Sequence, residues 1–577
     1  MFRNVSNYLN NNPIRVLIIW FFLLTIFKSI ISLFFEAPQS LGDEMEYDLI
    51  ARMIANGAII LGTGHYPSGY PPGYSACISL PYFFFSDRMV IYHVELFINA
   101  ILSSLAIFPA FFILKRFSTD QTAVMGSLTI SVLPVTLAPS FLLMSENLFT
   151  LLFLLASCGL IYSLSEKKSS LFDIGTGFLI IGSILVRPSG IALIMGLVLT
   201  LIYYISKTSE NRRDSLTKAA YLVSPIIAII ALWGVERILG DGSSGIHEAI
   251  YLSPGVLPLI GEHLTTFIHT AILGGLYLAY STYLFLFFAT GWYLWKIFKN
   301  DKNSNDKYLD TNIISKKTTL IFVFISSLFL YVIAILFTFG FIQWDIPHIY
   351  GRYIDPIIPF IILFSFVGTE QLITSKKEEQ KYFFIRFFVF LFITTAIAAF
   401  TFLPSLPVQN NNAGIYYLYS FSDTFTGIIL VLPLLFSIGY YFLILNQVSV
   451  GKIFSLILIL CVLTSIPILA WQIQMGKNYG EVHKAFCGIQ STLGAEATYI
   501  WDQSGNNGRY DPVYHDSIKF WIGDRLVEQN CDEVNSSIRR SYGIIPTQTK
   551  GVYLISRQDY PLKKLARMED FRFYRIS

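Results

Sequence analysis

The chain has 577 residues, of which 54% are apolar and only 14% are charged, and its formal net charge is +3. A soluble chain of this length carries roughly a quarter of its residues as charged side chains, so the composition excludes an ordinary soluble protein. The small net charge and the lack of a basic domain give no reason to expect a nucleic-acid partner.

Thirteen apolar runs are long enough to cross a bilayer as helices of about 17 to 25 residues. The first run is too long for the core of a signal peptide and has no small-residue cleavage site after it, so it is predicted to be the first span. The predicted fold class is a polytopic α-helical membrane protein. The runs are 14–35, 90–114, 121–141, 147–164, 171–186, 189–205, 219–238, 271–295, 319–341, 354–373, 384–403, 425–445 and 453–472.

The fifth and sixth runs are separated only by Arg187, Pro188 and Ser189, so Pro188 could instead kink one long helix. The distribution of Lys and Arg decides between two spans and one kinked helix, because cytoplasmic loops are enriched in both residue types. With two separate spans and a cytoplasmic N-terminus, twenty-one Lys and Arg before residue 474 fall inside and five outside. We therefore predict two spans, a cytoplasmic N-terminus and an external C-terminus. The five external arginines are Arg52, Arg88, Arg187, Arg237 and Arg352.

This topology divides the chain into a transmembrane domain, 1–473, with an external loop at 36–89, and an external soluble domain, 474–577. The mixed composition of the second predicts a small α/β or α+β domain. Strands are predicted at 497–502, 551–556 and 571–577 from their β-branched and aromatic residues, and helices near 481–493 and 561–569. A disulfide between Cys487 and Cys531 is permitted on this oxidising side.

The first external loop contains a predicted amphipathic helix that starts near Asp43. Met45, Leu49 and Met53 recur every four residues, which favours a helix lying on the membrane surface. Asp43 could cap this helix, with Glu46 three residues later completing an acidic capping box, and this role would not exclude chemistry. Asp48 and Arg52, four residues apart, are predicted to form a surface pair.

Further polar residues gather at the predicted outer ends of the spans. The loop YPSGYPPGYS at 66–75 is rich in Pro, Gly and Tyr and is either a connector or a substrate contact. Glu146 begins the fourth span, Arg187 ends the fifth, and HIYGRYIDPIIPF at 348–360 leads into the tenth. Each could be an interface anchor alone, but acids and arginines on one membrane face together favour a site there.

These residues resemble the GT-C superfamily of glycosyltransferases that use polyprenyl-phosphate sugars, closest to the branch with the protein O-mannosyltransferases and the lipid A aminoarabinose transferase. The resemblance covers roughly residues 1–470, in order and topology. Glu146 stands where the family often has Asp, which leaves its role open. The matching residues are Asp43, Glu44, Tyr47, Ala51, Arg52, Pro71, Pro72, Tyr74, Glu146, Arg187, Pro188, Arg352, Tyr353, Pro356 and Pro359.

The resemblance implies an inverting transfer of one sugar from a polyprenyl phosphate to an acceptor hydroxyl of a lipid, glycan or protein on the outer face. Such a reaction needs a carboxylate as general base, and Asp43 is the first candidate, with Glu44 second. Groups that stabilise the departing phosphate are also needed, and Arg352, Arg187 and Tyr353 are the candidates. The lipid tail requires an apolar groove that no single residue specifies.

Metal dependence varies in the superfamily, so no cofactor is predicted and a divalent metal is left open. The external residues His65, Glu146, His247, Glu248 and His263 offer donor atoms, but their spacing fits no metal motif. Glu146, His65 and Tyr74 are candidates for contact with substrate or metal.

Two other classes of function fit a polytopic protein. A flippase, polymerase or transporter of lipid-linked glycans would also carry external arginines, but it needs neither the acidic helix start nor an external C-terminal domain. A structural or assembly subunit would leave the acidic pair and the arginines without a role.

Overall fold

The computed structural model describes most of the helical chain and five strands. The chain forms two compact units: unit 1 comprises Met1–Lys28, Ile59–Tyr74 and Phe97–Ala470, and unit 2 comprises Ser29–Ala58, Ser75–Leu96 and Trp471–Ser577. The described residues are 12–38, 42–57, 70–165, 169–208, 212–239, 261, 263–299, 311–340, 350–401, 410–419, 428–493, 498–502, 526–529, 552–556, 563–568 and 571–575.

Helices dominate the described residues. Nine of them are long and apolar enough to cross a membrane, or up to eleven spans if each of two bent helix pairs counts as one. The chain is therefore an integral, multi-pass membrane protein, as predicted. The nine are Pro13–Ser32, Arg88–Lys115, Glu146–Ser165, Pro188–Lys207, Arg212–Leu232, Ile314–Phe339, Asp355–Thr374, Lys377–Ala398 and Val450–Lys477.

The helical elements follow one another in this order. They are α2 (Pro13–Ser32), α3 (Asp43–Ala55), α4 (Pro72–Ile78), η1 (Leu80–Phe83), α5 (Arg88–Leu105), α6 (Ile107–Lys115), α7 (Asp120–Ser131), α8 (Pro134–Leu137), η2 (Ala138–Phe141), α9 (Glu146–Ser165), α10 (Ser170–Val186), η3 (Pro188–Gly190), α11 (Ile191–Lys207), α12 (Arg212–Leu239), α15 (Leu264–Ser281), α16 (Phe285–Lys299), α17 (Thr311–Gly340), η7 (Gly351–Tyr353), η8 (Asp355–Ile357), α18 (Ile358–Thr374), α19 (Lys377–Thr401), η9 (Asn410–Ile415), α20 (Tyr416–Tyr419), α21 (Ile428–Leu445) and α22 (Val450–Leu493).

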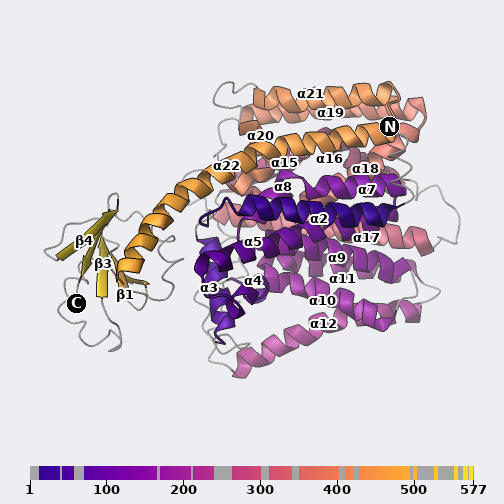
Figure 1. Cartoon of the computed structure of the whole chain (residues 1–577). Coiled ribbons are helices and arrows are strands. Elements are labelled where there is room, and N and C mark those ends of the chain that lie inside the picture. Colours follow the sequence, from indigo (N-terminus) through magenta and orange to yellow (C-terminus); the bar gives the residue numbers. More distant parts are fainter. Residues whose placement is uncertain are drawn as a thin grey trace. The chain divides into compact units, whose positions relative to one another are not determined.

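Each of the thirteen predicted runs overlaps a helix, and the separation of the fifth and sixth runs is confirmed. α10 ends at Val186 and α11 begins at Ile191, with the extended backbone of Arg187 and the short η3 between them. Gly190 lies against the backbone of Ser183 and Ile184, so closely that a Cβ there would overlap it. In unit 1, α9, α10, α11 and α17 lie side by side (Figure 1).

Two predicted spans are bent rather than continuous. The predicted span at 271–295 is interrupted by a break, because α15 and α16 meet at 100°. Tyr283 and Leu284 adopt left-handed φ values of 57° and 60°, a conformation that costs roughly 1–2 kcal/mol per residue, and no glycine marks the site. The buried Tyr283 hydroxyl lies 2.5 Å from the Thr464 hydroxyl of α22, which helps to hold the bend. Run 121–141 bends by 60° just before Pro134.

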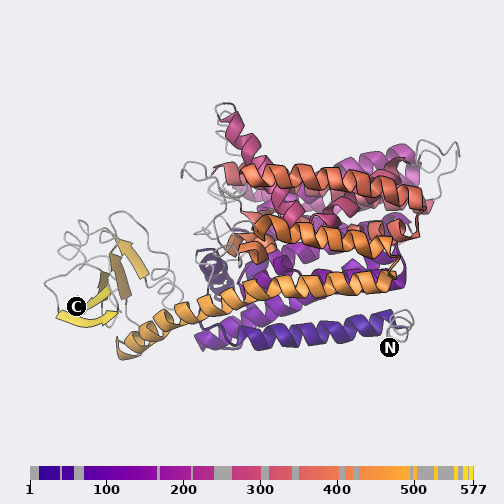
Figure 2. The same cartoon turned by 90° about the horizontal axis from the view of Figure 1, so that it is seen from above.

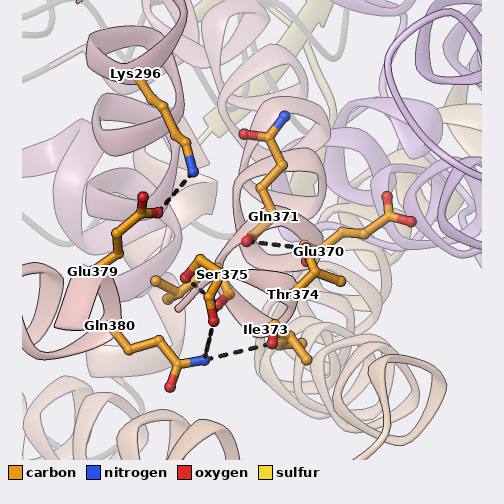
Figure 3. Close-up of polar contacts among 9 residues, drawn as sticks. Lys296, Glu370, Gln371, Ile373, Thr374, Ser375, Glu379 and Gln380 are labelled. Carbon is orange, nitrogen blue, oxygen red and sulfur yellow. Dashed lines mark hydrogen bonds and ion pairs between the residues drawn. The ribbon is translucent and has the colours of Figure 1, made fainter. Parts of the chain in front are cut away.

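The hairpin of α18 and α19 is closed by side-chain hydrogen bonds to main-chain carbonyls (Figure 3). Gln380 Nε2 donates to the carbonyl oxygens of Leu372 at 3.0 Å and of Ile373 and Ser375 at 3.5 Å, where α18 ends. The Leu372 carbonyl also accepts the N–H and the hydroxyl of Ser375, so several donors meet at this helix end, where carbonyls lack the usual helical partners. Lys296 Nζ, at the end of α16, lies 2.9 Å from Glu379 Oε2 and joins a third helix to the hairpin.

The C-terminal strands of unit 2 form one five-stranded sheet of order β2-β1-β3-β5-β4. β1 pairs in parallel with β2 and β3, whereas β5 pairs antiparallel with β3 and β4. The three predicted strands are confirmed as β1, β3 and β5. The strands are β1 (Thr498–Asp502), β2 (Leu526–Gln529), β3 (Val552–Ser556), β4 (Lys563–Met568) and β5 (Phe571–Arg575).

The predicted helix at 561–569 is wrong, because Lys563–Met568 is strand β4. Its sequence favours a helix, but pairing with β5 overrides that weak local preference. The helix predicted at 481–493 is confirmed as the end of α22, which Figure 2 shows as one continuous helix. The predicted disulfide is not tested, because Cys531 and the side chain of Cys487 lie outside the described residues.

Close helix packing in unit 1 depends on glycine, as is usual in membranes. Gly177 of α10 is buried against the Leu222 carbonyl and Pro225 of α12, and a Cβ there would overlap both. Gly175, two residues earlier in the same helix, has nothing within 4 Å of the position that a Cβ would take.

We predict that Gly177→Ala lowers the free energy of unfolding by about 1–3 kcal/mol through overpacking. Gly175→Ala should leave it unchanged or slightly higher, because Ala favours helices. Thermal melting in detergent compares the two variants, and equal melting temperatures would contradict this packing.

Candidate functional site

The acidic start of α3 is the first part of the candidate site, and it lies in unit 2. The helix begins at Asp43, as predicted, but the predicted cap is wrong: Gly42 is the N-cap residue, and no side-chain cap hydrogen bond forms. Gly42 adopts φ 88°, which glycine tolerates best, and its carbonyl accepts the Glu46 N–H at 3.0 Å. Asp43 is half-buried and Glu44 is fully buried. Both acids lie where the helix dipole favours negative charge.

Asp48 is not part of a surface pair, which corrects the prediction from its spacing. The side chain is 2% exposed, and its carboxylate pairs with Arg52 at 2.9 Å and also with Arg88 of α5. The prediction failed because Arg88 is distant in sequence and is brought to α3 only by folding. A buried carboxylate with two guanidinium partners makes this helix part of the protein interior.

Tyr82 of η1 lies at the centre of the same cluster. Its hydroxyl donates to Asp48 and accepts hydrogen bonds from Arg88 and, at 3.3 Å, from Arg52. Burial, together with the nearby charges of Asp48 and Glu95, raises the pKa of Tyr82, so the phenol stays protonated and can donate. Glu95 of α5 is fully buried beside this cluster. We refer to Asp48, Arg52, Tyr82, Arg88 and Glu95 as the α3 cluster.

Charge balance within the α3 cluster sets the protonation of Asp48. Burial alone would raise the pKa of Asp48, but the positive charges of Arg52 and Arg88 outweigh it and hold that pKa below its ordinary value. Asp48 is therefore ionised at neutral pH and stabilises the two buried guanidinium groups.

A second polar cluster, in unit 1, contains four of the predicted site residues. Glu146, the first residue of α9, forms an ion pair with Arg187 at the end of α10, with 3.0 Å between Oε1 and Nη1, and both side chains are buried. The Arg187 guanidinium lies 5.0 Å from the centroid of the Tyr353 ring, and that of Arg352 lies 5.1 Å from the same centroid. Arg352 Nη2 also donates to the Tyr353 hydroxyl at 3.2 Å. We call Glu146, Arg187, Arg352 and Tyr353 the arginine cluster.

The loop that carries Arg352 and Tyr353 is fixed by the buried Tyr277 of α15. The Tyr277 hydroxyl donates to Asp355 at 2.5 Å and accepts the Gly414 N–H at 3.2 Å. Gly351 packs against the Tyr277 ring, where a Cβ would overlap it, and its N–H donates to Asn412 at 2.9 Å.

The structure thus brings Glu146, Arg187, Arg352 and Tyr353 together, but it does not add Tyr74 to them. Tyr74 is buried in α4, where its hydroxyl donates to Asn99 Oδ1 at 3.0 Å, which indicates a structural contact. His65 lies outside the described residues.

Four residues of the two clusters and their surroundings were not predicted from the sequence: Tyr82, Glu95, Tyr277 and Asn412. Glu95 alone carried a signal, since it is an acid within an apolar run.

Metal binding finds no support within the described ranges. No group of three or more His, Cys, Asp or Glu side chains there could hold a metal ion. Of the predicted donors, Glu146 pairs with Arg187 and His263 is the N-cap residue of α15. His65, His247 and Glu248 lie outside the described residues. The arginine cluster suits a different ligand, because guanidinium groups beside a phenol are typical partners of phosphate.

No protein-family model matches the sequence, and no curated protein matches it at a significant level. Solved structures do match. ArnT from Cupriavidus metallidurans bound to undecaprenyl phosphate is 13% identical with a TM-score of 0.57, and the match covers 97% of this chain and 98% of that chain. The apo state of the same protein gives 12% identity and a TM-score of 0.54 over the same shares. The fold implied by the predicted resemblance is thus confirmed, because this chain shares the fold of ArnT over nearly its whole length.

Asp48→Asn tests the electrostatics of the α3 cluster. Breaking a buried ion pair leaves uncompensated charge, so we expect a loss of about 3–5 kcal/mol of stability at pH 7. Because the pKa of Asp48 is lower in the folded state, its stabilisation is present above the unfolded pKa of about 4 and is lost as the pH falls through the folded value. The difference in melting temperature between wild type and variant should therefore shrink on acidification.

The matched control for this variant is Asp87→Asn. Asp87 is exposed and accepts the Val90 N–H at 2.9 Å at the start of α5. Asn caps about as well as Asp, so this variant should melt like the wild type at every pH. A pH-independent difference for Asp48→Asn would show that the ionised carboxylate is not what stabilises the cluster.

Proposed function

We propose that this protein is a membrane glycosyltransferase that moves one monosaccharide from a polyprenyl-phosphate carrier to an acceptor hydroxyl. The observation that carries the proposal is the arginine cluster at the ends of α9 and α10, in a fold shared over 97% of the chain with a protein solved with undecaprenyl phosphate bound. The acceptor belongs to a lipid, a glycan or a protein, and the transfer inverts the anomeric carbon.

Arg352 is assigned to the phosphate of the donor. Its guanidinium can form two parallel hydrogen bonds to phosphate oxygens, which an ammonium group cannot do. Arg187 is already paired with Glu146 at 3.0 Å, so its charge is partly neutralised and we assign it a supporting role. Tyr353 lies beside both guanidiniums and can donate its phenolic proton to a phosphate oxygen. These groups stabilise the negative charge that develops as the carrier phosphate departs.

Asp43 is assigned as the general base. It takes the proton of the acceptor hydroxyl while that oxygen forms a bond to the anomeric carbon, and the bond from this carbon to the phosphate oxygen breaks with its electron pair. Asp43 is half-buried, whereas Glu44 is fully buried, which favours Asp43 for contact with an incoming acceptor. Glu44 is assigned to orientation of the helix start.

The competing proposal is a flippase, polymerase or transporter of lipid-linked glycans without this transfer chemistry. Purified protein supplied with a radiolabelled polyprenyl-phosphate sugar and a pool of acceptors distinguishes the two. Release of the carrier phosphate together with a labelled product supports a transferase. Movement of intact labelled carrier across the membrane of a vesicle, without release, would favour the competing proposal.

The choice of Asp43 can be separated from any structural role. Asp43→Asn and Asp43→Ser should keep expression and melting temperature, because both replacements retain a side-chain oxygen that accepts hydrogen bonds from backbone N–H groups at a helix start. Neither replacement accepts a proton near neutral pH, so transfer should fall by roughly two or more orders of magnitude. Glu44→Gln, the matched control, should reduce transfer less. Normal transfer by Asp43→Asn with an inactive Glu44→Gln would assign the base to Glu44 instead.

The proposal also includes thirteen spans, a cytoplasmic N-terminus and an external domain at 474–577. The support is the Lys and Arg distribution, in which twenty-one such residues fall on one side of the membrane and five on the other. In a variant without native cysteines, we expect Gly505→Cys to react with an impermeant thiol reagent added outside intact cells. Glu210→Cys should react only after permeabilisation. The opposite result would invert the topology.

A further inference from the structure

The turn between α4 and α5 presents large apolar side chains away from the protein. Leu80, Phe83, Phe84 and Phe85 are all exposed, and Phe84 reaches 78%. In the same turn, Tyr82 points inward to Asp48, and Pro81 is buried. We call residues 80–85 the aromatic turn. Tyr82 and Pro81 face the protein interior, so the four exposed side chains form the outer face of the aromatic turn.

The aromatic turn lies near the end of one membrane-spanning segment, α2, and just before the start of another, α5. α5 starts at Arg88, directly after the turn, and belongs to the candidate span Arg88–Lys115. The start of α5 is tied to the chain that follows α2, because the Tyr92 hydroxyl donates to the Ala37 carbonyl at 3.1 Å and His93 Nε2 lies 3.0 Å from the Phe35 carbonyl. The turn is therefore close to the membrane boundary of both spans.

Exposed apolar side chains continue from these spans to the aromatic turn. Leu33 and Phe34, at the end of α2, are exposed, and so is Val90 in the first turn of α5. Such side chains on membrane-spanning segments face lipid. Polar character resumes with Ser86 and Asp87, both exposed, immediately after Phe85. A phenylalanine-rich segment bounded by polar residues is typical of the headgroup and acyl-chain boundary.

We infer that the aromatic turn inserts into the lipid headgroup and acyl-chain boundary, on the side where α2 ends, and that its partner is bilayer lipid. The insertion has a consequence for α3. Tyr82 is hydrogen-bonded to Asp48, Arg52 and Arg88, so the turn, α3 and the start of α5 are joined by one buried network. Lipid contact by the turn therefore fixes the depth of α3 at the membrane surface. Helix α3 is labelled in Figure 1. This inference does not depend on the proposed function.

The test places a photoreactive p-benzoylphenylalanine at Phe84 in the full-length protein. The purified protein is placed in nanodiscs of radiolabelled phosphatidylcholine and phosphatidylglycerol without polyprenyl lipid and is then irradiated. Phe392, in the candidate span of α19, is the matched lipid-facing control, because it is 76% exposed. Glu378, exposed in the charged first turn of α19, is the water-facing control.

We expect lipid labelling at position 84 to lie within about threefold of that at position 392 and about fivefold or more above that at position 378, as immersion in the interface requires. Labelling at position 84 no higher than at position 378 would overturn the inference. So would crosslinking of position 84 to protein instead of lipid, or loss of lipid labelling on addition of unlabelled polyprenyl phosphate, which would assign the turn to the carrier. If the Phe84 variant does not fold, the probe moves to Phe83, which is 59% exposed.

Discussion

Charged groups taken out of water must be neutralised where they lie, and this requirement shapes both polar clusters of the protein. In unit 1 the Arg187 guanidinium is held by Glu146 and borders the Tyr353 ring. In unit 2 two guanidiniums converge on the Asp48 carboxylate through helices that are distant in sequence. The pairs Glu146–Arg187 and Asp48–Arg88 each join one helical segment to another.

In the proposed function, the arginine cluster binds the departing phosphate through Arg352, while Arg187 keeps its internal partner. Arg187 has an internal partner and belongs to the framework, whereas Arg352 stands on a short loop and is half-buried. Preorganised donors of this kind stabilise developing charge without reorganising during the reaction. The rigid environment of Tyr277 and Asp355 keeps that loop in place.

Hydropathy predicted the helices well, because a bilayer forces a backbone to satisfy its hydrogen bonds within each segment. The helix predicted from Met45 and Leu49 was likewise confirmed as α3, whereas its position on the membrane surface stays a prediction. Asp48 was misplaced because its second partner, Arg88, is distant in sequence. The bend at Tyr283 had no glycine or proline to indicate it, and it depends on a contact with α22. β4 was misassigned because its strand pairing is tertiary. The sequence predicts what local chemistry decides and fails where distant partners decide.

The hydroxyl group of Tyr277 has a consequence for motion. It donates to Asp355 and accepts from Gly414, while Gly351 packs against the ring with no room for a side chain. Two segments more than fifty residues apart therefore form hydrogen bonds to the same oxygen atom. We expect a ligand that displaces Arg352 to shift the segment at 410–415 as well, so that occupancy at one loop is transmitted mechanically to the other.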